Sequence, residues 1–128
     1  MATVTPTELA VLTGHRNCRV FKWAQVNGGD DCVPVVCAGY TDKTVYGWRA
    51  TGSTFGGTLT IVGSPDPSKG AITDTTETFQ TLSDPQGNTI SKTANFVEAV
   101  LEHAYWIKPV AGASITLTDI TVVLASTK

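Results

Sequence analysis

The chain has 128 residues, a formal net charge of −2 at pH 7 and only 16% charged residues, against about 25% in an average globular protein. A chain of this length buries enough surface to fold without a metal or disulfide staple, so we expect one domain over residues 1–128. The absence of excess cations argues against nucleic-acid binding through phosphate neutralisation. Apolar residues make up 41%, which excludes a disordered chain.

The first residues, Met1 to Pro6, contain neither a positive segment nor an apolar one, so no signal peptide is predicted. No apolar run approaches the roughly 20 residues that a membrane span needs, and no membrane association is expected. The three cysteines, an odd number, are interpreted as free thiols in a reducing cytoplasm.

Short segments of alternating polarity predict strands along the whole chain. In residues 44–49, Tyr46 and Trp48 fall on one face and Val45 on the other; in residues 57–63, Leu59 and Ile61 share a face. The strand candidates are residues 18–26, 33–38, 44–49, 57–63, 105–110 and 115–124.

The final strand shows a change of phase. Its apolar residues occupy odd positions up to Leu117 and even positions from Ile120 onward. One extra residue near Thr118 and Asp119 restores a single inward face, which predicts a β-bulge there. Pro109 has no N–H group to donate, so we expect it at a strand end or a sheet edge.

Turn-forming residues separate these segments at short intervals, for example at residues 64–67 and 84–88. Residues 63–78 are polar without periodicity and are interpreted as a long surface loop. Residues 95–102 fit either a strand or one to two helical turns, with Asn95 as a possible cap. The predicted fold class is all-β, an antiparallel β-sandwich with at most one short helical segment.

Four soft or borderline ligands stand in the segments His15-x2-Cys18 and Cys32-x4-Cys37, the number that a structural zinc ion needs. Their spacing lacks the tight Cys-x2-Cys pairs of zinc loops, so we predict that Cys18 and Cys37 are small core residues on strands and that His15 lies in a turn. A thiol nucleophile would need a base such as His103, and nothing near it in the sequence orients this imidazole.

The carboxylate pairs are equally uninformative. Asp30 and Asp31 lie in a glycine-rich turn, and Glu98 and Glu102 would meet only on a helix. The glycines of residues 52–57 precede a strand, whereas a phosphate-binding loop follows a strand and opens a helix. The sequence therefore predicts no enzyme, with no catalytic residue, no cofactor and no metal site.

Aromatic residues leave three interpretations open. They can belong to the sandwich core, to a subunit interface, or to a platform on which sugars stack. The residues concerned are Trp23, Trp48 and Trp106, with Tyr40, Tyr46 and Tyr105.

Residues 39–125 resemble small virion proteins of tailed bacteriophages that decorate or cement the capsid. The resemblance rests on residues 39–45 and 52–64, on the turn Leu82-Ser83-Asp84-Pro85-Gln86-Gly87-Asn88, on the acidic-apolar segment 97–102, on Tyr105-Trp106-Ile107-Lys108-Pro109-Val110, and on residues 117–122. The chain departs from that pattern after Ser64, where Pro65-Asp66-Pro67 and a longer insertion replace an Asn-Asp-Gly type of turn, and residues 79–82 take the place of the next strand.

What this resemblance implies is a jelly-roll-like sandwich on the capsid surface of the virion, assembled in the host cytoplasm. Its partners would be the major capsid protein and further copies of itself, as a dimer or trimer. Two alternatives stay open: another virion component (tail, adaptor or fibre-associated), or a carbohydrate-binding module for adhesion to a host surface.

The N-terminal residues 1–8 are expected to form an extended arm. Residues 2–6 are uncharged and precede the first apolar group, so they are suited to strand addition onto a neighbouring subunit. The predicted protein-interface residues are Ala2, Thr3, Val4, Thr5, Pro6, Trp48 and Trp106.

Overall fold

The computed structural model describes residues 2–11, 17–67 and 79–126. This part of the chain contains strands and turns and no helix, which confirms the all-β prediction. The strands are β1 (Thr3–Val4), β2 (Thr7–Leu9), β3 (Cys18–Val26), β4 (Asp31–Cys32), β5 (Val35–Val36), β6 (Asp42–Trp48), β7 (Thr54–Ser64), β8 (Gln80–Thr81), β9 (Ser91–Ala94), β10 (Phe96–Ala99), β11 (Trp106–Ala111) and β12 (Thr118–Ala125).

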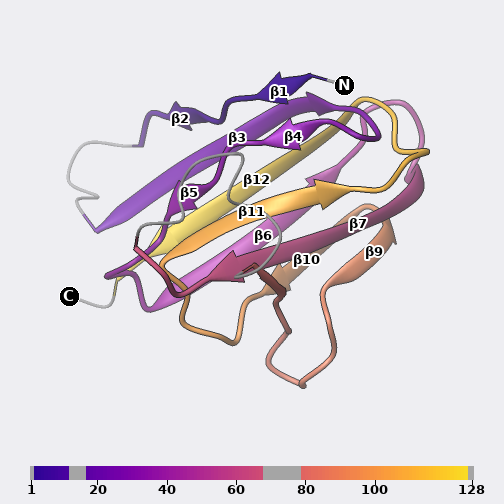
Figure 1. The fold of residues 1–128 in the computed structure, drawn as a ribbon. Coiled ribbons are helices and arrows are strands. Elements are labelled where there is room, and N and C mark those ends of the chain that lie inside the picture. The colour runs from indigo at the N-terminus through magenta and orange to yellow at the C-terminus, as the bar shows by residue number, and fades with distance from the viewer. Residues whose placement is uncertain (1, 12–16, 68–78, 127–128) are drawn as a thin grey trace.

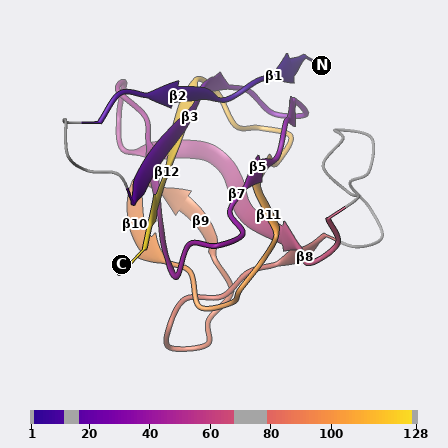
Figure 2. The ribbon, with the colours of Figure 1, turned by 90° about the vertical axis from the view of Figure 1, so that its left-hand side faces the viewer.

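Two five-stranded sheets form the body of the molecule. The first has the order β10-β6-β12-β3-β2 and the second the order β5-β11-β7-β8, with β9 also paired to β7. Figure 2 shows them as two layers, with β3, β12 and β10 in one and β5, β11 and β8 in the other. A short parallel pair, β1 with β4, lies beside them.

The strand pairing is nested, because strands from the first half of the chain pair with strands from the second half in reverse order. β3 pairs with β12, β5 with β11, β6 with β10, and β7 with β9. All four pairings are antiparallel, as in a long hairpin wrapped into two layers. This is the strand order of a jelly roll, and it confirms the predicted jelly-roll-like sandwich (Figure 1).

One apolar core fills the space between the two sheets. The first sheet contributes Trp23, Val45 and Ile120, and the second contributes Leu59 and Ile107; each is at most 1% exposed. The alternation of residues 44–49 is confirmed, with Val45 buried and Trp48 exposed. The indole of Trp23 donates a hydrogen bond to the carbonyl of Val33 at 2.9 Å, so this polar group is satisfied inside the core.

The ladder is irregular where the bulge was predicted, near Thr118 and Asp119, but the extra residue lies in β3 and not in the last strand. The register of β12 against β3 shifts between Thr118 and Ile120, since Thr118 pairs with Val26 and Ile120 pairs with Trp23. Asp119 thus stands opposite two residues of β3, Ala24 and Gln25, while Thr118 and Ile120 keep the ordinary alternation of β12 and are both buried. Leu117, which was expected to face inward, is 55% exposed. Pro109 lies where β11 is paired on one side only, with Ile61 of β7, because β5 reaches no farther than Ile107. Its missing N–H therefore costs no ladder hydrogen bond.

The structure decides one alternative that the sequence left open and corrects two expectations. Residues 95–102 contain no helical turn: Phe96–Ala99 form β10, which pairs with β6 and is the edge strand of the first sheet. The strand expected at 33–38 is reduced to the two residues of β5. The surface loop predicted at 63–78 begins later, since β7 continues to Ser64, and residues 68–78 lie outside the described part of the chain.

Candidate protein interface

The outer face of the first sheet is a broad surface that few charged side chains interrupt. Register fixes which residues stand side by side on this face. One row across the five strands consists of Val97, Tyr46, Thr121, Lys22 and Thr7. The neighbouring row consists of Ala99, Thr44, Val123, Val20 and Leu9, none of them charged.

The charges on this outer face are few and largely compensated. Lys22 and Asp119 form an ion pair at 3.5 Å. The second carboxylate oxygen of Asp119 accepts a hydrogen bond from the backbone N–H of Gln25 at 2.7 Å, next to the bulge. Covering this face with another protein would therefore require little desolvation of unpaired charge.

Exposed apolar side chains gather where β6 and β10 meet. Tyr46 is 41% exposed, Trp48 57%, Val97 58% and Leu101 53%. Of these four residues, called here the β6–β10 patch, Tyr46 and Trp48 lie on β6, Val97 lies on β10 directly opposite Tyr46, and Leu101 follows the end of β10 by two residues. Clustered exposure of this kind is typical of interaction sites, whereas single exposed apolar residues are ordinary.

A shallow hollow of about 330 Å³ adjoins the patch, with a lining of Tyr46, Gly47, Trp48, Asn95, Phe96 and Val97. Asn95 is held by two hydrogen bonds: its side-chain oxygen accepts from the N–H of Arg49 at 3.0 Å, and its own N–H donates to Ser53. The guanidinium of Arg49 donates through Nη1 to the carbonyl of Thr54. These contacts fix one wall of the hollow.

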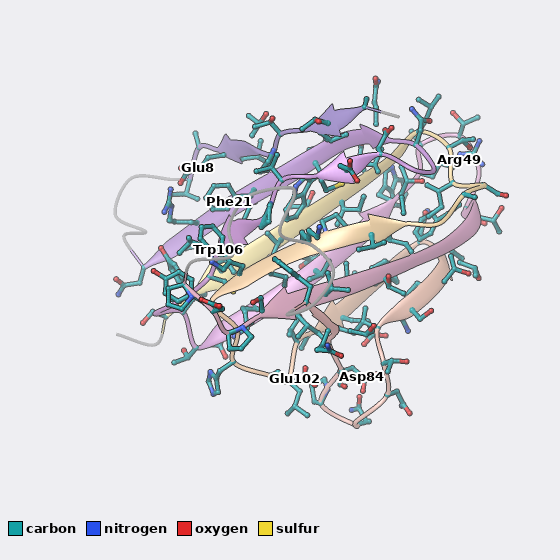
Figure 3. The ribbon with its side chains drawn as sticks, in the orientation of Figure 1. Glu8, Phe21, Arg49, Asp84, Glu102 and Trp106 are labelled. Carbon is teal, nitrogen blue, oxygen red and sulfur yellow. The ribbon has the colours of Figure 1, made fainter. Side chains whose placement is uncertain are left out.

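Trp106, the other aromatic residue predicted at an interface, lies elsewhere. It begins β11 of the second sheet, packs against Tyr105 with ring centroids 5.5 Å apart, and donates from its indole to Pro67 at 3.3 Å. Figure 3 places Trp106 at the opposite end of the sandwich from Arg49, the residue that follows Trp48. The structure thus does not bring Trp48 and Trp106 into one site.

The remaining aromatic residues are divided between core and surface. Trp23 is 1% exposed, so it is not available for a sugar platform. Tyr40 packs against the core but is partly exposed, and it lines a hollow together with Tyr105. Tyr46 and Trp48 are the exposed aromatic pair on the first sheet.

The N-terminal residues lie along their own chain in this structure. β1 pairs with β4 and β2 pairs with β3, and Figure 1 shows both strands following the edge of β3. The carbonyl of Ala2 accepts from Asp31 at 2.8 Å and that of Val4 accepts from Val33 at 2.9 Å. Among residues 2–6, Thr3 and Thr5 are exposed, whereas Val4 packs against the core.

Cys37 is a core residue as predicted, whereas Cys18, also predicted in the core, is only partly buried and lies outside the core cluster. Cys32 and Cys37 are buried, and burial raises the pKa of Cys32 to about 12 and that of Cys37 to about 11. Cys37 and His103 line one hollow of about 270 Å³, but the Cys37 thiol donates to the carbonyl of Ala104 at 3.1 Å. A thiol nucleophile needs a lowered pKa, so this pair does not have the arrangement of a catalytic dyad.

Side chains that could bind a metal ion do not gather in the described residues. The described residues contain no group of three or more His, Cys, Asp or Glu side chains suited to a metal ion. His15, part of the zinc pattern considered above, lies outside them. Glu98 and Glu102 do not pair: Glu98 binds Lys92 at 2.7 Å, and Glu102 accepts a hydrogen bond from the N–H of Ser83.

Sequence reasoning missed two buried lysines. Lys43 is 2% exposed, with its ammonium 3.5 Å from the carbonyl of Tyr40. Lys108 is 4% exposed and lies over the ring of Phe79, and burial lowers its pKa. The alternation of β6 carried a signal for Lys43, because this residue shares the inward phase of Val45.

Comparison with known proteins gives no relative: no family model, no curated protein and no solved structure matches the chain. In the part of the chain that the structure describes, no helix is long and apolar enough to cross a membrane.

Proposed function

We propose that this protein decorates the capsid of a tailed bacteriophage, where it binds the outer shell surface and bridges neighbouring major capsid proteins. The observation that carries the proposal is the outer face of the first sheet, which is wide, carries few charges and is bordered by the β6–β10 patch. The resemblance of residues 39–125 to virion proteins suggests the major capsid protein as the partner of this surface. The protein would also associate with further copies of itself.

The physical argument rests on the composition of this surface and requires no catalytic residue. A β-sheet face made of threonine, valine, alanine and aromatic side chains can lie against another protein with little loss of charge solvation. A decorating protein needs no catalytic group, because it acts by adding contacts across the boundaries between capsid subunits. Many weak contacts distributed over one shell act together and strengthen it.

The test is quantitative mass spectrometry of purified virions, expressed as copies of this chain per major capsid protein. A ratio near one, or a simple fraction of one, supports capsid decoration. A handful of copies per particle would assign the protein to the tail, an adaptor or a fibre instead. Absence from the virion would refute the proposal in all of these forms.

Carbohydrate binding is the second candidate, and the exposed pair Tyr46 and Trp48 favours it. Both rings project from the same face of β6, where a sugar ring can stack on an indole. Titration with glycans should then change the tryptophan fluorescence of the native protein but not that of a Trp48→Ala variant. An unchanged spectrum across a glycan series would exclude this role for Trp48.

A further inference from the structure

Strand β10 forms one edge of the first sheet, and its outward edge is unpaired in the described residues. The N–H of Val100 donates to Lys43 of β6 at 2.9 Å. Because bonding alternates along an antiparallel ladder, the N–H and C=O groups of Val97 and Ala99 point away from β6. Asn95 and Leu101 have the same outward phase, and their N–H groups are taken by Ser53 and Ser83 at 2.8 Å each.

The unpaired part of this edge, called here the window, therefore consists of Val97 and Ala99 and ends at Asn95 and Leu101, whose N–H groups are already bonded. Between the two anchored residues, Val97 and Ala99 present two donors and two acceptors that have no hydrogen-bond partner within the described chain. On the outer face this strand displays only apolar side chains, those of Val97 and Ala99 followed by Leu101. Unpaired edges with apolar faces are templates for adding a further strand.

We infer that a second copy of this chain occupies this edge, with β10 pairing antiparallel to itself about a two-fold axis. Pairing centred on Glu98 sets Val97 opposite Ala99 of the second copy, and Ala99 opposite its Val97. This satisfies the outward backbone groups of both copies. The two first sheets then continue into one sheet across the dimer, which is an isologous interface.

The side chains at the two ends of the window complement each other in this register. Leu101 of the second copy stands opposite Asn95, next to the 330 Å³ hollow lined by Trp48, Asn95 and Val97. Leu101 is 53% exposed in the single chain, so pairing covers this apolar side chain by placing it against the lining of the hollow. The two-fold axis repeats this contact at the other end.

Charge also permits self-contact. An interface that meets itself repels wherever it carries net charge, and the β6–β10 patch carries none. The charged residue of β10 is Glu98, which faces its own copy across the axis. Each Glu98 is neutralised by Lys92 at 2.7 Å, with both side chains about one-quarter to one-third exposed. The interface thus requires Lys92, although this residue lies on β9.

The inference rests on the self-association included in the proposed function and deepens it by naming the edge that pairs. It does not rest on capsid binding, because the dimer is expected of the isolated protein. Sedimentation equilibrium should give a mass twice that of one chain at about 100 μM. A monomer at this concentration would overturn the inference, as would a trimer, since two-fold edge pairing closes at two copies. Copy number in virions measures the proposed function separately.

Val97→Pro is the sharpest variant. It removes an N–H that points away from β6, so the sheet keeps its own hydrogen bonds and far-UV circular dichroism should be unchanged. The dimer should dissociate at least about tenfold more readily, whereas Val97→Thr, which keeps the N–H and the β-branched shape, should stay dimeric. In the unmodified protein, the amide protons of Val97 and Ala99 should exchange more slowly as concentration rises. Concentration-independent exchange would contradict the pairing.

Leu101→Lys tests the contact of Leu101 with the hollow of the second copy, and Val110→Lys is its matched control. Val110 is 42% exposed on β11, in the second sheet. Leu101→Lys should weaken the dimer by at least about tenfold while Val110→Lys leaves it intact. The reverse result would place the interface on the second sheet and overturn the inference.

The charge argument has a test of its own. Lys92→Met leaves two uncompensated Glu98 carboxylates face to face and should weaken the dimer, an effect that high salt reduces. Adding Glu98→Gln in the same chain should restore association. Failure of the double variant to recover, with both variants folded, would exclude a register centred on Glu98.

Discussion

Phe96 lies directly opposite Gly47 across the β10–β6 ladder, and its ring covers the place where a glycine has no side chain. A Cβ atom on Gly47 would stand 2.3 Å from Cε1 of Phe96 and 3.0 Å from Cζ of Phe55. The rings of Phe55 and Phe96 meet edge to face with centroids 6.2 Å apart. The glycine therefore allows an aromatic residue on the edge strand to close the end of the core and the floor of the hollow.

Gly47→Ala should accordingly destabilise the fold by about 1–3 kcal/mol, since an added methyl group forces the Phe96 ring out of its position. Denaturant unfolding of the variant measures this change. The double variant Gly47→Ala/Phe96→Leu should lose less than the sum of the two single changes, because the smaller side chain leaves room for the methyl group. Strict additivity would show that the two residues do not share this contact.

The cysteines should differ sharply in reactivity. At pH 8 an alkylating reagent should modify Cys18, which is partly exposed, and leave the buried Cys32 and Cys37 unmodified until the protein is unfolded. The physical reason is that burial raises the pKa of both buried thiols and shields them from reagents. Mass spectrometry of tryptic peptides reads the pattern, and rapid native labelling of Cys37 would contradict it.

The same thiols predict how stability depends on pH. In the unfolded chain a thiol ionises near its ordinary value of 9.0, whereas Cys32 in the folded protein ionises only near 12. Above pH 9 the folded state therefore holds more protons than the unfolded one, so the free energy of unfolding falls as pH rises. Cys32→Ala should make the fall between pH 9 and 11 shallower, and this comparison with the unmodified protein isolates Cys32 from the lysines. Identical slopes would refute the assignment.

The sequence predicted this fold well wherever one face of a strand is buried. Period-two alternation located β6 and β7. The phase change in the last strand indicated an irregular ladder near Thr118, but not that the extra residue belongs to β3, because that depends on pairing between distant strands. The secondary structure of residues 95–102 was ambiguous in the sequence. Phe96 and Val100 are four residues apart, and this spacing places them on one face of a helix and also on one face of a strand. Tertiary pairing with β6 decided the matter.

The candidate site was harder to predict than the fold. The exposure of Trp48 follows from its phase in β6, but Val97 and Leu101 join it only because β10 is the neighbouring strand, and no local pattern encodes that pairing. The sequence also grouped Trp48 with Trp106, which lie on different sheets. Long-range register, rather than composition, decides which exposed residues form one surface.

The N-terminal arm allows a test of its own. Deleting residues 2–6 removes two backbone hydrogen bonds to Asp31 and Val33 and the packing of Val4. The domain should stay folded with a loss of about 1–3 kcal/mol, because both sheets and the core remain. If the arm serves strand addition to a neighbouring subunit, attachment to capsids should weaken far more than stability does. Unchanged attachment would remove the arm from the proposed interface.

The last prediction concerns the outer face of the first sheet. It compares two threonines, one on each sheet, that are substituted in the same way. Thr44 of β6 lies in the uncharged row between Ala99 and Val123, whereas Thr60 of β7 faces outward from the second sheet opposite Val110. Thr44→Glu introduces a charge that capsid binding would have to desolvate. Capsids prepared without the protein should then bind this variant on the order of tenfold more weakly, while Thr60→Glu binds as the unmodified protein does.

Both variants should unfold at similar denaturant concentrations, since both threonines are half-buried on strand faces that point away from the core. Equal binding by Thr44→Glu and the unmodified protein would show that the first sheet does not contact the shell. Weaker binding by Thr60→Glu alone would move the contact to the second sheet, where Trp106 lies. The pair of variants therefore assigns the capsid-binding face as well as testing for it.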